Sequence, residues 1–329
     1  MRAIVIEAFG GPEVLHWAEV PKPEAGPGEA LVRVAYASVN PADWKTREGM
    51  LSKYIDCQFP FVLGFDLAGV VEAVGPGVVA LKPGDRVFGT SRLGQGANGS
   101  YAEYTTAYAA MLAPVPDRVA LSEAAAMPTA GTTAYGGLVD AGGLRAGQTV
   151  LINGGAGGVG SIAIQIAKAF GARVAVTCAA ANADYVSSLG ADLAIDYRAE
   201  DVPSAVRRWA PIGVDLVLDA VGLDTLLPSA AAVVKPGGRY VEIETLMSAA
   251  SEAQIADAAR QGVRIVSNMA AIARLPEHLA GLARLVSEGR VRMPALELMP
   301  LGEARRAHER IAQGHVRGKI VLEVGGAAT

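Results

Sequence analysis

A glycine cluster between an apolar strand and an apolar helix constrains the fold of this chain more than any other feature. Residues 149–152 form a short run of mostly β-branched side chains, which is typical of a buried parallel strand. Apolar residues resume after the cluster and continue to residue 170, which is long enough for a helix. Within the cluster, Gly155, Gly157 and Gly160 make the pattern G-x-G-x-x-G. We expect the first glycine to permit a tight turn, the second to let a pyrophosphate approach the backbone, and the third to let the helix pack closely on the strand.

The surroundings of this pattern favour a dinucleotide site over a glycine-rich loop without a ligand. A strand precedes it, a helix follows, and residues 173–178 predict a second strand, as a βαβ unit requires. The start of a helix offers N–H groups and the positive end of its dipole to phosphates. The residues expected to bind the cofactor here are Gly155, Ala156, Gly157, Gly158, Val159 and Gly160.

The composition is that of a globular chain with two domains. Of the 329 residues, 51% are hydrophobic and 19% are charged, which permits a large core and argues against disorder. A net charge of −4 without basic clusters gives no footprint for nucleic acid. The uncharged stretch between Arg145 and Lys168 is interrupted by polar residues and glycines, so we do not expect it to span a membrane. Cys57 and Cys178 lie far apart and Glu7 interrupts the apolar N-terminus, so we expect a reducing, cytoplasmic location without export.

The chain changes character near residue 121 and again after residue 267. Before the first change it reads as short strands between proline- and glycine-rich turns, at residues 2–6, 30–38, 69–74 and 86–89. Between the two changes, strands alternate with helices, which predicts an open parallel sheet with helices on both faces. The expected strands there are 149–152, 173–178, 193–196, 215–219, 238–242 and 263–267, and the helices are 124–127, 132–140, 184–189, 202–209 and 225–234.

The tail of the chain departs from this alternation. The expected elements are helices at 276–288 and 302–313 and strands at 295–299 and 319–324. The last strand has no βα partner, so we expect it to complete the sheet of the first domain.

Several motifs resemble one superfamily, the medium-chain dehydrogenase/reductases. They are G-F-D-L-A-G-V-V-E-A-V-G at 64–75, K-P-G-D-R-V at 82–87 and G-S-Y-A-E-Y at 99–104. S-V-N-P-A-D-W-K at 38–45 and G-H-V-R-G-K-I-V-L at 314–322 resemble its zinc-free quinone oxidoreductase branch, which includes zeta-crystallin. The resemblance implies an α/β fold in which a doubly wound parallel-sheet (Rossmann) cofactor domain, residues 123–269, is inserted into a β-rich GroES-like catalytic domain, residues 1–122 and 270–329.

The residues at the family's metal positions argue against zinc. Alcohol-oxidising members hold a catalytic zinc with Cys, His, Glu and Cys, because zinc prefers nitrogen and sulfur ligands in a tetrahedral array. The matching positions here carry Asn40, Phe65, Asp66 and Pro128 or a close neighbour. Phenylalanine cannot bind a metal, neither cysteine falls at a ligand position, and the four clustered cysteines of the structural zinc lobe are missing. We therefore expect no metal.

Without a Lewis acid, deprotonating an alcohol is difficult, whereas hydride transfer to an electron-poor conjugated acceptor is easier. We therefore expect a reductase of small molecules, either quinones or conjugated enones and enals. The resemblance places Asn40 near the nicotinamide; simple turn chemistry in Asn-Pro-Ala-Asp is the alternative. Asp43 and Lys45 are weaker catalytic candidates, and a surface ion pair explains them equally well.

Two other functions stay open. Enoyl-thioester reductases of this superfamily carry a tyrosine just after the N-P-x-D segment, where this chain has Met50 and Leu51, and Tyr54 lies further on. This departure disfavours enoyl reduction on thioester or carrier-bound intermediates without removing it. A non-catalytic, crystallin-like NADPH-binding protein also remains, because the family keeps its cofactor fold with or without turnover.

The end of the second βαβ strand bears on the choice of cofactor. An acidic residue there would bind the 2′-hydroxyl of NAD, and this strand ends at Cys178 without one. We therefore expect NADPH, with NADH as the alternative. The resemblance implies that Tyr197 lies against the adenosine phosphate, with Arg198 as the nearest cation, and places Val221 and Gly222 near the nicotinamide ribose. Thr132 and Ala179 complete the expected cofactor site.

Two further expectations concern the end of the sheet. Glu242 and Glu244 lie at the end of a strand, where relatives have small or neutral residues, and would repel an anionic substrate if they point into the cleft. Residues 263–267 predict an apolar edge strand, which invites pairing with a second chain. Because relatives dimerise through this element, we expect a homodimer.

Overall fold

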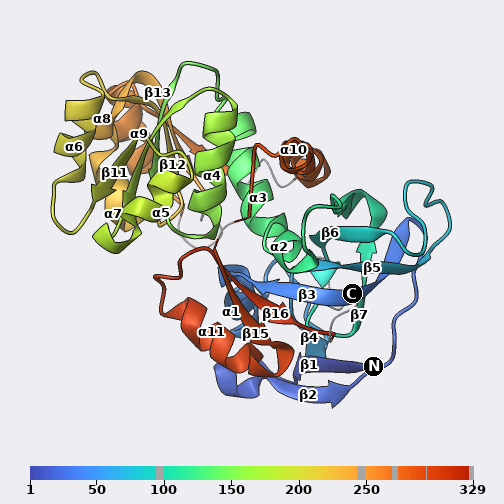
Figure 1. Cartoon of the computed structure of the whole chain (residues 1–329). Helices are drawn as coiled ribbons and strands as arrows, with labels where there is room; N and C mark the ends of the chain where they lie inside the picture. The colour runs from blue at the N-terminus through green and yellow to red at the C-terminus, as the bar shows by residue number, and fades with distance from the viewer. Residues whose placement is uncertain (94–98, 244–248, 269–272, 294, 326–329) are drawn as a thin grey trace. The chain divides into compact units, whose positions relative to one another are not determined.

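The structure is a computed structural model that describes residues 1–93, 99–243, 249–268, 273–293 and 295–325 (Figure 1). It forms two compact units. Unit 1 comprises Met1–Thr129 and Met293–Thr329, and unit 2 comprises Ala130–Arg292. In the described residues, every helix is too short or too polar to cross a membrane.

Unit 1 is built from two sheets that are mostly antiparallel. The larger has seven strands in the order β15-β16-β3-β5-β6-β8, with β7 also paired to β3, and the smaller has the order β2-β1-β4. Their bounds are β1 (Arg2–Ile6), β2 (His16–Glu19), β3 (Glu29–Val39), β4 (Phe61–Val62), β5 (Asp66–Val74), β6 (Arg86–Thr90), β7 (Tyr104–Tyr108), β8 (Leu112–Pro114), β15 (Leu296–Pro300) and β16 (Lys319–Glu323). Alternate residues of β3, namely Ala30, Val32 and Val34, face one apolar core, as the two-residue period of a strand requires.

The last strand of the chain joins the sheet of the first segment, as the sequence predicts. β16 pairs antiparallel with β3, with Ile320 opposite Val39, and Figure 1 shows the red β16 beside the blue β3. Unit 1 also contains helices α1 (Pro41–Arg47), α2 (Leu121–Ala125) and α11 (Ala304–Ala312). α1, which was not predicted from the sequence, has Pro41 at its first position, where a helix tolerates proline.

Unit 2 contains a six-stranded, wholly parallel sheet in the order β11-β10-β9-β12-β13-β14. The strands are β9 (Thr149–Asn153), β10 (Arg173–Cys178), β11 (Leu193–Asp196), β12 (Val214–Asp219), β13 (Val234–Glu242) and β14 (Arg264–Ser267). The strand order reverses between the neighbours β9 and β12, because the chain runs outward from β9 to β11 and then returns to form β12 on the other side of β9. Doubly wound sheets bind ligands at such a reversal. β14 lies at the edge, as expected.

Helices cover both faces of this sheet, so the doubly wound prediction is confirmed. Val217 of β12 packs in a core with α6, α8 and α9. Its neighbour Leu218 faces Gly137 of the π-helical segment η4 (Gly136–Ala141), where an added Cβ would lie 2.6 Å from the leucine. The helices are α3 (Pro128–Tyr135), α4 (Gly158–Ala169), α5 (Ala183–Ser188), α6 (Val202–Trp209), α7 (Leu223–Leu226), α8 (Ala230–Val233), α9 (Glu252–Arg260) and α10 (Leu275–Ser287).

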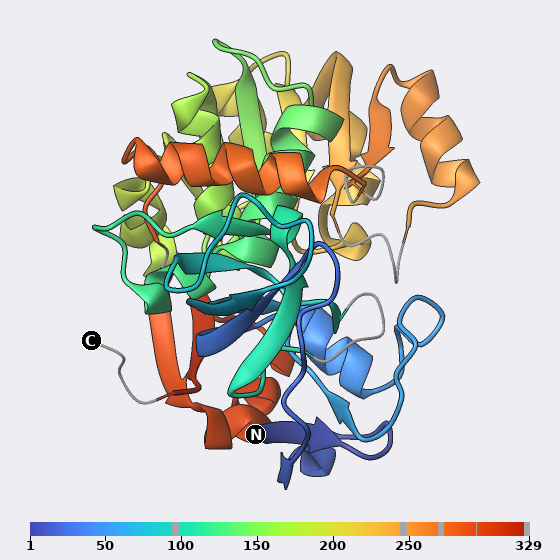
Figure 2. The ribbon, with the colours of Figure 1, turned by 90° about the vertical axis from the view of Figure 1, so that its right-hand side faces the viewer.

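The units divide later in the chain than expected, at 129/130 and 292/293 rather than at 122/123 and 269/270. The difference at the second boundary comes from α10, which packs within unit 2 (Figures 1 and 2). Its Leu282 contacts Gly131 so closely that an added Cβ would lie 2.3 Å away, and His278 Nε2 lies 2.6 Å from Asp140 Oδ2. α10 therefore belongs to the unit that carries the parallel sheet.

Candidate functional site

The glycine pattern of unit 2 lies between β9 and α4. The left-handed backbone conformation belongs to Gly154, with φ +85°, one residue before the glycine to which the sequence assigned the turn. Gly155 is required for another reason, since an added Cβ would lie 2.7 Å from Val176 Cβ. At Gly160 an added Cβ would lie 2.1 Å from the Gly154 carbonyl oxygen, so the third glycine lets α4 pack closely on the loop that follows β9.

The second glycine faces open space. An added Cβ at Gly157 would meet only the carbonyl oxygen of Gly154, at 3.8 Å. The first N–H groups of α4, which begins at Gly158, have no partner within the helix. A loop of glycines and one alanine, beside N–H groups that have no partner within the helix, fits a pyrophosphate. These residues therefore fit a dinucleotide cofactor.

A buried polar network that the sequence did not reveal joins the ends of four neighbouring strands. Thr177 Oγ1 of β10 accepts from the Gly154 N–H at 2.9 Å and donates to Asn153 Oδ1 of β9 at 2.6 Å. Asn153 Nδ2 donates to Asp219 Oδ1 of β12 at 2.8 Å, and the hydroxyl of Tyr240 in β13 donates to Asp219 Oδ2 at 2.6 Å. The sequence feature that could have indicated this network is a polar residue at the end of an apolar strand. This network holds the glycine loop at the carboxyl edge of the sheet.

Asp219 also shapes the turn that carries two predicted cofactor residues. Its Oδ1 accepts from the N–H groups of Val221 at 3.0 Å and Gly222 at 3.1 Å. Gly222 has φ +135°, which disfavours any side chain. Val221 lies over the loop, since its Cγ2 would be 2.7 Å from an added Cβ on Gly154. The structure therefore brings Val221 and the glycine loop together.

The other predicted cofactor residues of unit 2 come from α3 and from the segments that follow β10 and β11. Ala179 follows β10 directly, and Thr132 is buried in α3. Tyr197 follows β11, its side chain is 45% exposed, and the Arg198 guanidinium lies 5.5 Å from its ring centroid. Asp196, the last residue of β11, pairs with Cys178, the last residue of β10. An acidic side chain is therefore present beside the end of β10, on the neighbouring strand.

In unit 1, the fully buried Asp66 is the centre of a cluster of polar side chains. Its Oδ1 accepts from the backbone N–H of Thr129 at 2.9 Å and from the Thr129 hydroxyl at 2.6 Å. Its Oδ2 accepts from Ser38 Oγ at 2.8 Å and from Asn40 Nδ2 at 2.9 Å. A carboxylate offers about four acceptor positions, so the hydrogen bonds to Asp66 occupy all of them.

Lys319 completes this cluster from the far end of the chain. Its Nζ donates to Asn40 Oδ1 at 2.5 Å and to the Val39 carbonyl at 3.0 Å, and lies 3.8 Å from Asp66 Oδ2. The residue is 5% exposed. Burial lowers the pKa of the Lys319 ammonium, and the charges of Asp66 and Asp43 act in the opposite direction. Sequence reasoning used Lys319 only as part of a motif and gave it no role.

Asp43 is buried, which excludes the surface ion pair considered for it. Its Oδ2 accepts from the Asn40 N–H at 2.7 Å and its Oδ1 accepts from the Phe65 N–H at 3.2 Å. Burial is the main cause that raises the pKa of Asp43 to about 7. Lys45 lies further along α1, half-buried, with its ammonium 5.6 Å from the Trp44 ring centroid. The structure thus joins Asn40 to Asp43.

A second buried chain of side chains anchors α1 to α11. Arg47 Nη1 lies 3.2 Å from His308 Nδ1, and the Tyr101 hydroxyl lies 3.2 Å from His308 Nε2. Burial, followed by the charge of Arg47, lowers the pKa of His308 to about 3, so its ring is neutral at physiological pH. These residues fix α1, the helix that directly follows Asn40.

The cluster around Asp66 does not fit a zinc ion. Asn40, Asp66 and Thr129, the last beside Pro128, occupy the positions expected for zinc ligands in metal-dependent relatives, and hydrogen bonds join them directly. Every acceptor position of Asp66 is used, and the buried ammonium of Lys319 repels a divalent cation. The donor set also lacks the nitrogen and sulfur ligands that zinc prefers.

Glu242 closes β13 with a buried carboxyl that is 4% exposed. Oε2 lies 3.4 Å from the Ala250 N–H, and within the described part of the chain no group hydrogen-bonds Oε1. Burial raises the pKa of Glu242. Glu244 lies outside the described residues, so the structure bears only on Glu242. The Glu242 side chain is a buried carboxyl rather than an exposed charge.

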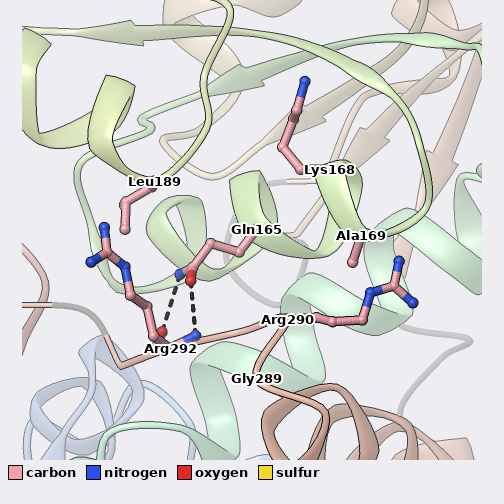
Figure 3. A pocket seen from close by; sticks show the side chains of 7 residues that line it. All are labelled: Gln165, Lys168, Ala169, Leu189, Gly289, Arg290 and Arg292. Carbon is pink, nitrogen blue, oxygen red and sulfur yellow. Dashed lines mark hydrogen bonds between the residues drawn. The ribbon is translucent and has the colours of Figure 1, made fainter.

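A cavity of about 390 Å³ lies at the other end of α4 from the glycine loop (Figure 3). Gln165 crosses it, with Nε2 donating to the Arg292 carbonyl at 3.1 Å and Oε1 accepting from the Arg292 N–H at 2.9 Å. Lys168 is bound to Asp192, and Arg292 donates to the Ser188 carbonyl. α4 is about 18 Å long, so this cavity is separate from the phosphate loop.

Two family models match the chain. Residues 26–117 match the alcohol dehydrogenase GroES-like domain, and residues 189–322 match a family described as zinc-binding dehydrogenase. Together they cover most of both units.

Relatives match over most or nearly all of the chain. A chloroplastic quinone oxidoreductase of Triphysaria versicolor is 33% identical over 98% of this chain and 98% of its own length. A chloroplastic NADPH-dependent alkenal/one oxidoreductase of Arabidopsis thaliana is 39% identical over 74% of this chain and 62% of its own length. A trans-enoyl reductase of Aspergillus terreus is 34% identical over 91% of this chain and 87% of its own length.

Solved structures of similar fold also match nearly the whole chain. A quinone oxidoreductase from Coxiella burnetii has a TM-score of 0.86 and 34% identity, covering 99% of both chains. A mycobacterial protein complexed with NADPH has a TM-score of 0.84 and 32% identity, covering 98% of this chain and 100% of its own.

Proposed function

We propose, because this chain belongs to the medium-chain dehydrogenase/reductase superfamily, that it is a zinc-independent reductase of quinones or of conjugated enones and enals. The observation that carries this proposal is the cluster around Asp66. Its acceptor positions are filled by Asn40, Thr129 and Ser38, and Lys319 supplies a fixed positive charge. Such a site cannot activate an alcohol through a metal, and it retains a polar group for an electron-poor acceptor.

Unit 2 holds the cofactor in this proposal. The open side of Gly157 and the first N–H groups of α4 bind the pyrophosphate. The network from Thr177 through Asn153 to Asp219 keeps the loop and the Val221 turn in place. When bound, NADPH supplies the hydride.

Asn40 is the residue proposed to meet the substrate. Its Nδ2 donates one hydrogen to Asp66 and carries a second, for which the described residues provide no acceptor. A hydrogen bond from this amide to the carbonyl oxygen of a quinone or enone stabilises the negative charge that develops there as hydride arrives. Asp43 holds the backbone N–H of Asn40 and so sets the start of α1.

NADPH is the proposed cofactor, supported by the absence of an acid at the end of β10 and by Arg198 beside the exposed Tyr197. We also propose a homodimer, supported by the position of β14 at the edge of the six-stranded sheet. The widely separated cysteines support a cytoplasmic location.

Oxidation of NADPH against a panel of small quinones, enones and thioester-linked enoyl compounds tests the function. The proposal expects turnover with quinones or enones. The similarity to a trans-enoyl reductase favours enoyl reduction as the second candidate, which would show as turnover of the thioesters alone. Tyr54, the tyrosine nearest in sequence to the position of the missing proton donor, is 58% exposed. Protection from thermal unfolding by NADPH, without turnover of any acceptor, would instead identify a binding protein.

A further inference from the structure

We propose that Lys319 is a positioning residue whose buried ammonium holds the Asn40 side chain in one orientation. This inference rests on the proposed function, in which Asn40 meets the substrate. Lys319 touches no part of that substrate in the proposal. Lys319 acts through the Asn40 amide, because its ammonium keeps Oδ1 toward Lys319 and Nδ2 toward Asp66.

A side-chain amide has two orientations of nearly equal shape, and its neighbours decide between them. At Asn40 the two neighbours carry opposite charges. The Lys319 ammonium donates to Oδ1 at 2.5 Å, and the Asp66 carboxylate accepts from Nδ2 at 2.9 Å. A rotation of the amide by 180° would set two donors against each other at Lys319 and two acceptors against each other at Asp66. Both interactions would be lost in a buried site, so the pair of charges fixes the amide.

The backbone holds Lys319 where this contact is made. Lys319 opens β16, whose next residue Ile320 pairs with Val39 of β3, the residue before Asn40. Its Nζ also donates to the Val39 carbonyl at 3.0 Å. The ammonium also forms an ion pair with Asp66 Oδ2, at 3.8 Å, which is too long for a hydrogen bond. The side chain is therefore anchored independently of Asn40.

The charge of Lys319 matters as well as its hydrogen bonds. The cluster contains two buried carboxyls, Asp43 and Asp66, and Lys319 is the cation in contact with Asp66. Breaking a buried ion pair by removing one partner leaves the other charge uncompensated. A neutral residue at 319 therefore favours protonation of the carboxyls, and a protonated Asp66 no longer attracts the Asn40 Nδ2 group.

The alternative is that Lys319 only ties β16 to β3. A double-mutant cycle separates the two roles, because a residue that acts through Asn40 loses its effect when Asn40 is gone. Lys319→Met is expected to lower kcat by about 10- to 100-fold, with little change in the KM for NADPH. In an Asn40→Ala background the same substitution is expected to have no further effect. Multiplicative effects of the two substitutions would overturn the proposal.

Two further variants complete the kinetic test. Lys319→Arg keeps the charge and is expected to retain more activity than Lys319→Met. Lys82→Met removes an exposed lysine from a turn of the same unit and is expected to change nothing. Should Lys319→Met fail to fold, Lys319→Gln replaces it, because an amide still donates to the Val39 carbonyl without the charge.

A spectroscopic measurement tests the positioning without turnover. In protein labelled with nitrogen-15 at asparagine side chains, the Asn40 signal is the one lost in Asn40→Ala. We expect its two amide protons to be widely separated in the parent protein, because one is bonded to a carboxylate, and to move together in Lys319→Met but not in Lys82→Met. An unchanged signal in Lys319→Met would overturn the proposal. A changed signal in a protein that reduces no acceptor would refute the proposed function and leave the positioning intact.

Discussion

The Lys319 ammonium lies 2.5 Å from the side-chain oxygen of Asn40, although 279 residues separate the two positions. The contact exists because β16, near the end of the chain, pairs with β3, near its beginning. The same pairing places Lys319 against Asp66, where zinc-dependent relatives are expected to carry a metal ligand. Lys319 thus provides a positive charge in a cluster whose side chains do not fit as zinc ligands.

Two glycines of the phosphate loop are expected to respond differently to the same methyl group. Gly157→Ala should leave the melting temperature nearly unchanged, because an added Cβ meets only one atom, at 3.8 Å, and should weaken NADPH binding by about 10-fold or more. Gly160→Ala should destabilise the protein by about 1–3 kcal/mol, since its Cβ would lie 2.1 Å from the Gly154 oxygen. Thermal unfolding and fluorescence titration with NADPH measure both. Equal behaviour of the two variants would contradict the assignment of Gly157 to the phosphate.

Asp43 should make stability depend on pH. Its pKa is raised from 3.8 to about 7, so folding favours the protonated form, and its contribution to the free energy of unfolding falls as pH rises from about 4 through 7. Asp43→Asn removes this titration, but an amide cannot accept from both the Asn40 and Phe65 N–H groups. The variant should therefore be less stable at pH 5, with a smaller deficit at pH 9. A deficit that grows with pH would show that the carboxyl is charged in the fold.

Glu242 should destabilise the protein at neutral pH. Burial raises its pKa, so the carboxyl contributes most to stability below its unfolded value of 4.5 and progressively less as pH rises through its folded value. Glu242→Gln should raise the melting temperature at pH 8 and have a smaller effect at pH 4.5. Urea or thermal unfolding at the two pH values measures the difference. A loss of stability at pH 8 would mean that Glu242 has a charged partner.

Arg198 should distinguish the two nicotinamide cofactors. Its guanidinium lies beside the exposed ring of Tyr197, at the edge where an adenosine 2′-phosphate is proposed to bind. Arg198→Ala should raise the KM for NADPH by about 10-fold, because a charge-assisted hydrogen bond to phosphate is lost, and leave the KM for NADH unchanged. Steady-state kinetics with both cofactors and one acceptor provide the measurement. Equal effects on both cofactors would remove Arg198 from phosphate recognition.

The regular parts of unit 2 were predictable because each strand or helix carries its own local pattern. β10, β11 and α6 have the bounds that the sequence predicts. The helix expected at 225–234 is broken instead into α7, the 3₁₀ turn η6 (Leu227–Ser229) and α8, since Pro228 lacks the N–H that a continuous helix needs. Local sequence patterns thus predict where helices and strands form, but not where a helix is interrupted.

The sites were likewise predictable only where their residues are contiguous in the sequence. The glycine loop is contiguous, so its motif identified it, although the positive φ falls on Gly154 rather than Gly155. The cluster of Asn40, Asp66 and Lys319 depends on pairing between distant strands, and no local pattern reports which buried lysine meets which amide. Asn40 was found only through the family resemblance.

The central claim is that this chain reduces its acceptor without zinc. The most direct measurement is the rate of NADPH oxidation with a quinone or enone acceptor, before and after exhaustive treatment with a chelator, with the zinc content of the protein determined in parallel. The account predicts an unchanged rate in protein that contains far less than one zinc per chain. Loss of activity on chelation, with recovery when zinc is restored, would contradict it.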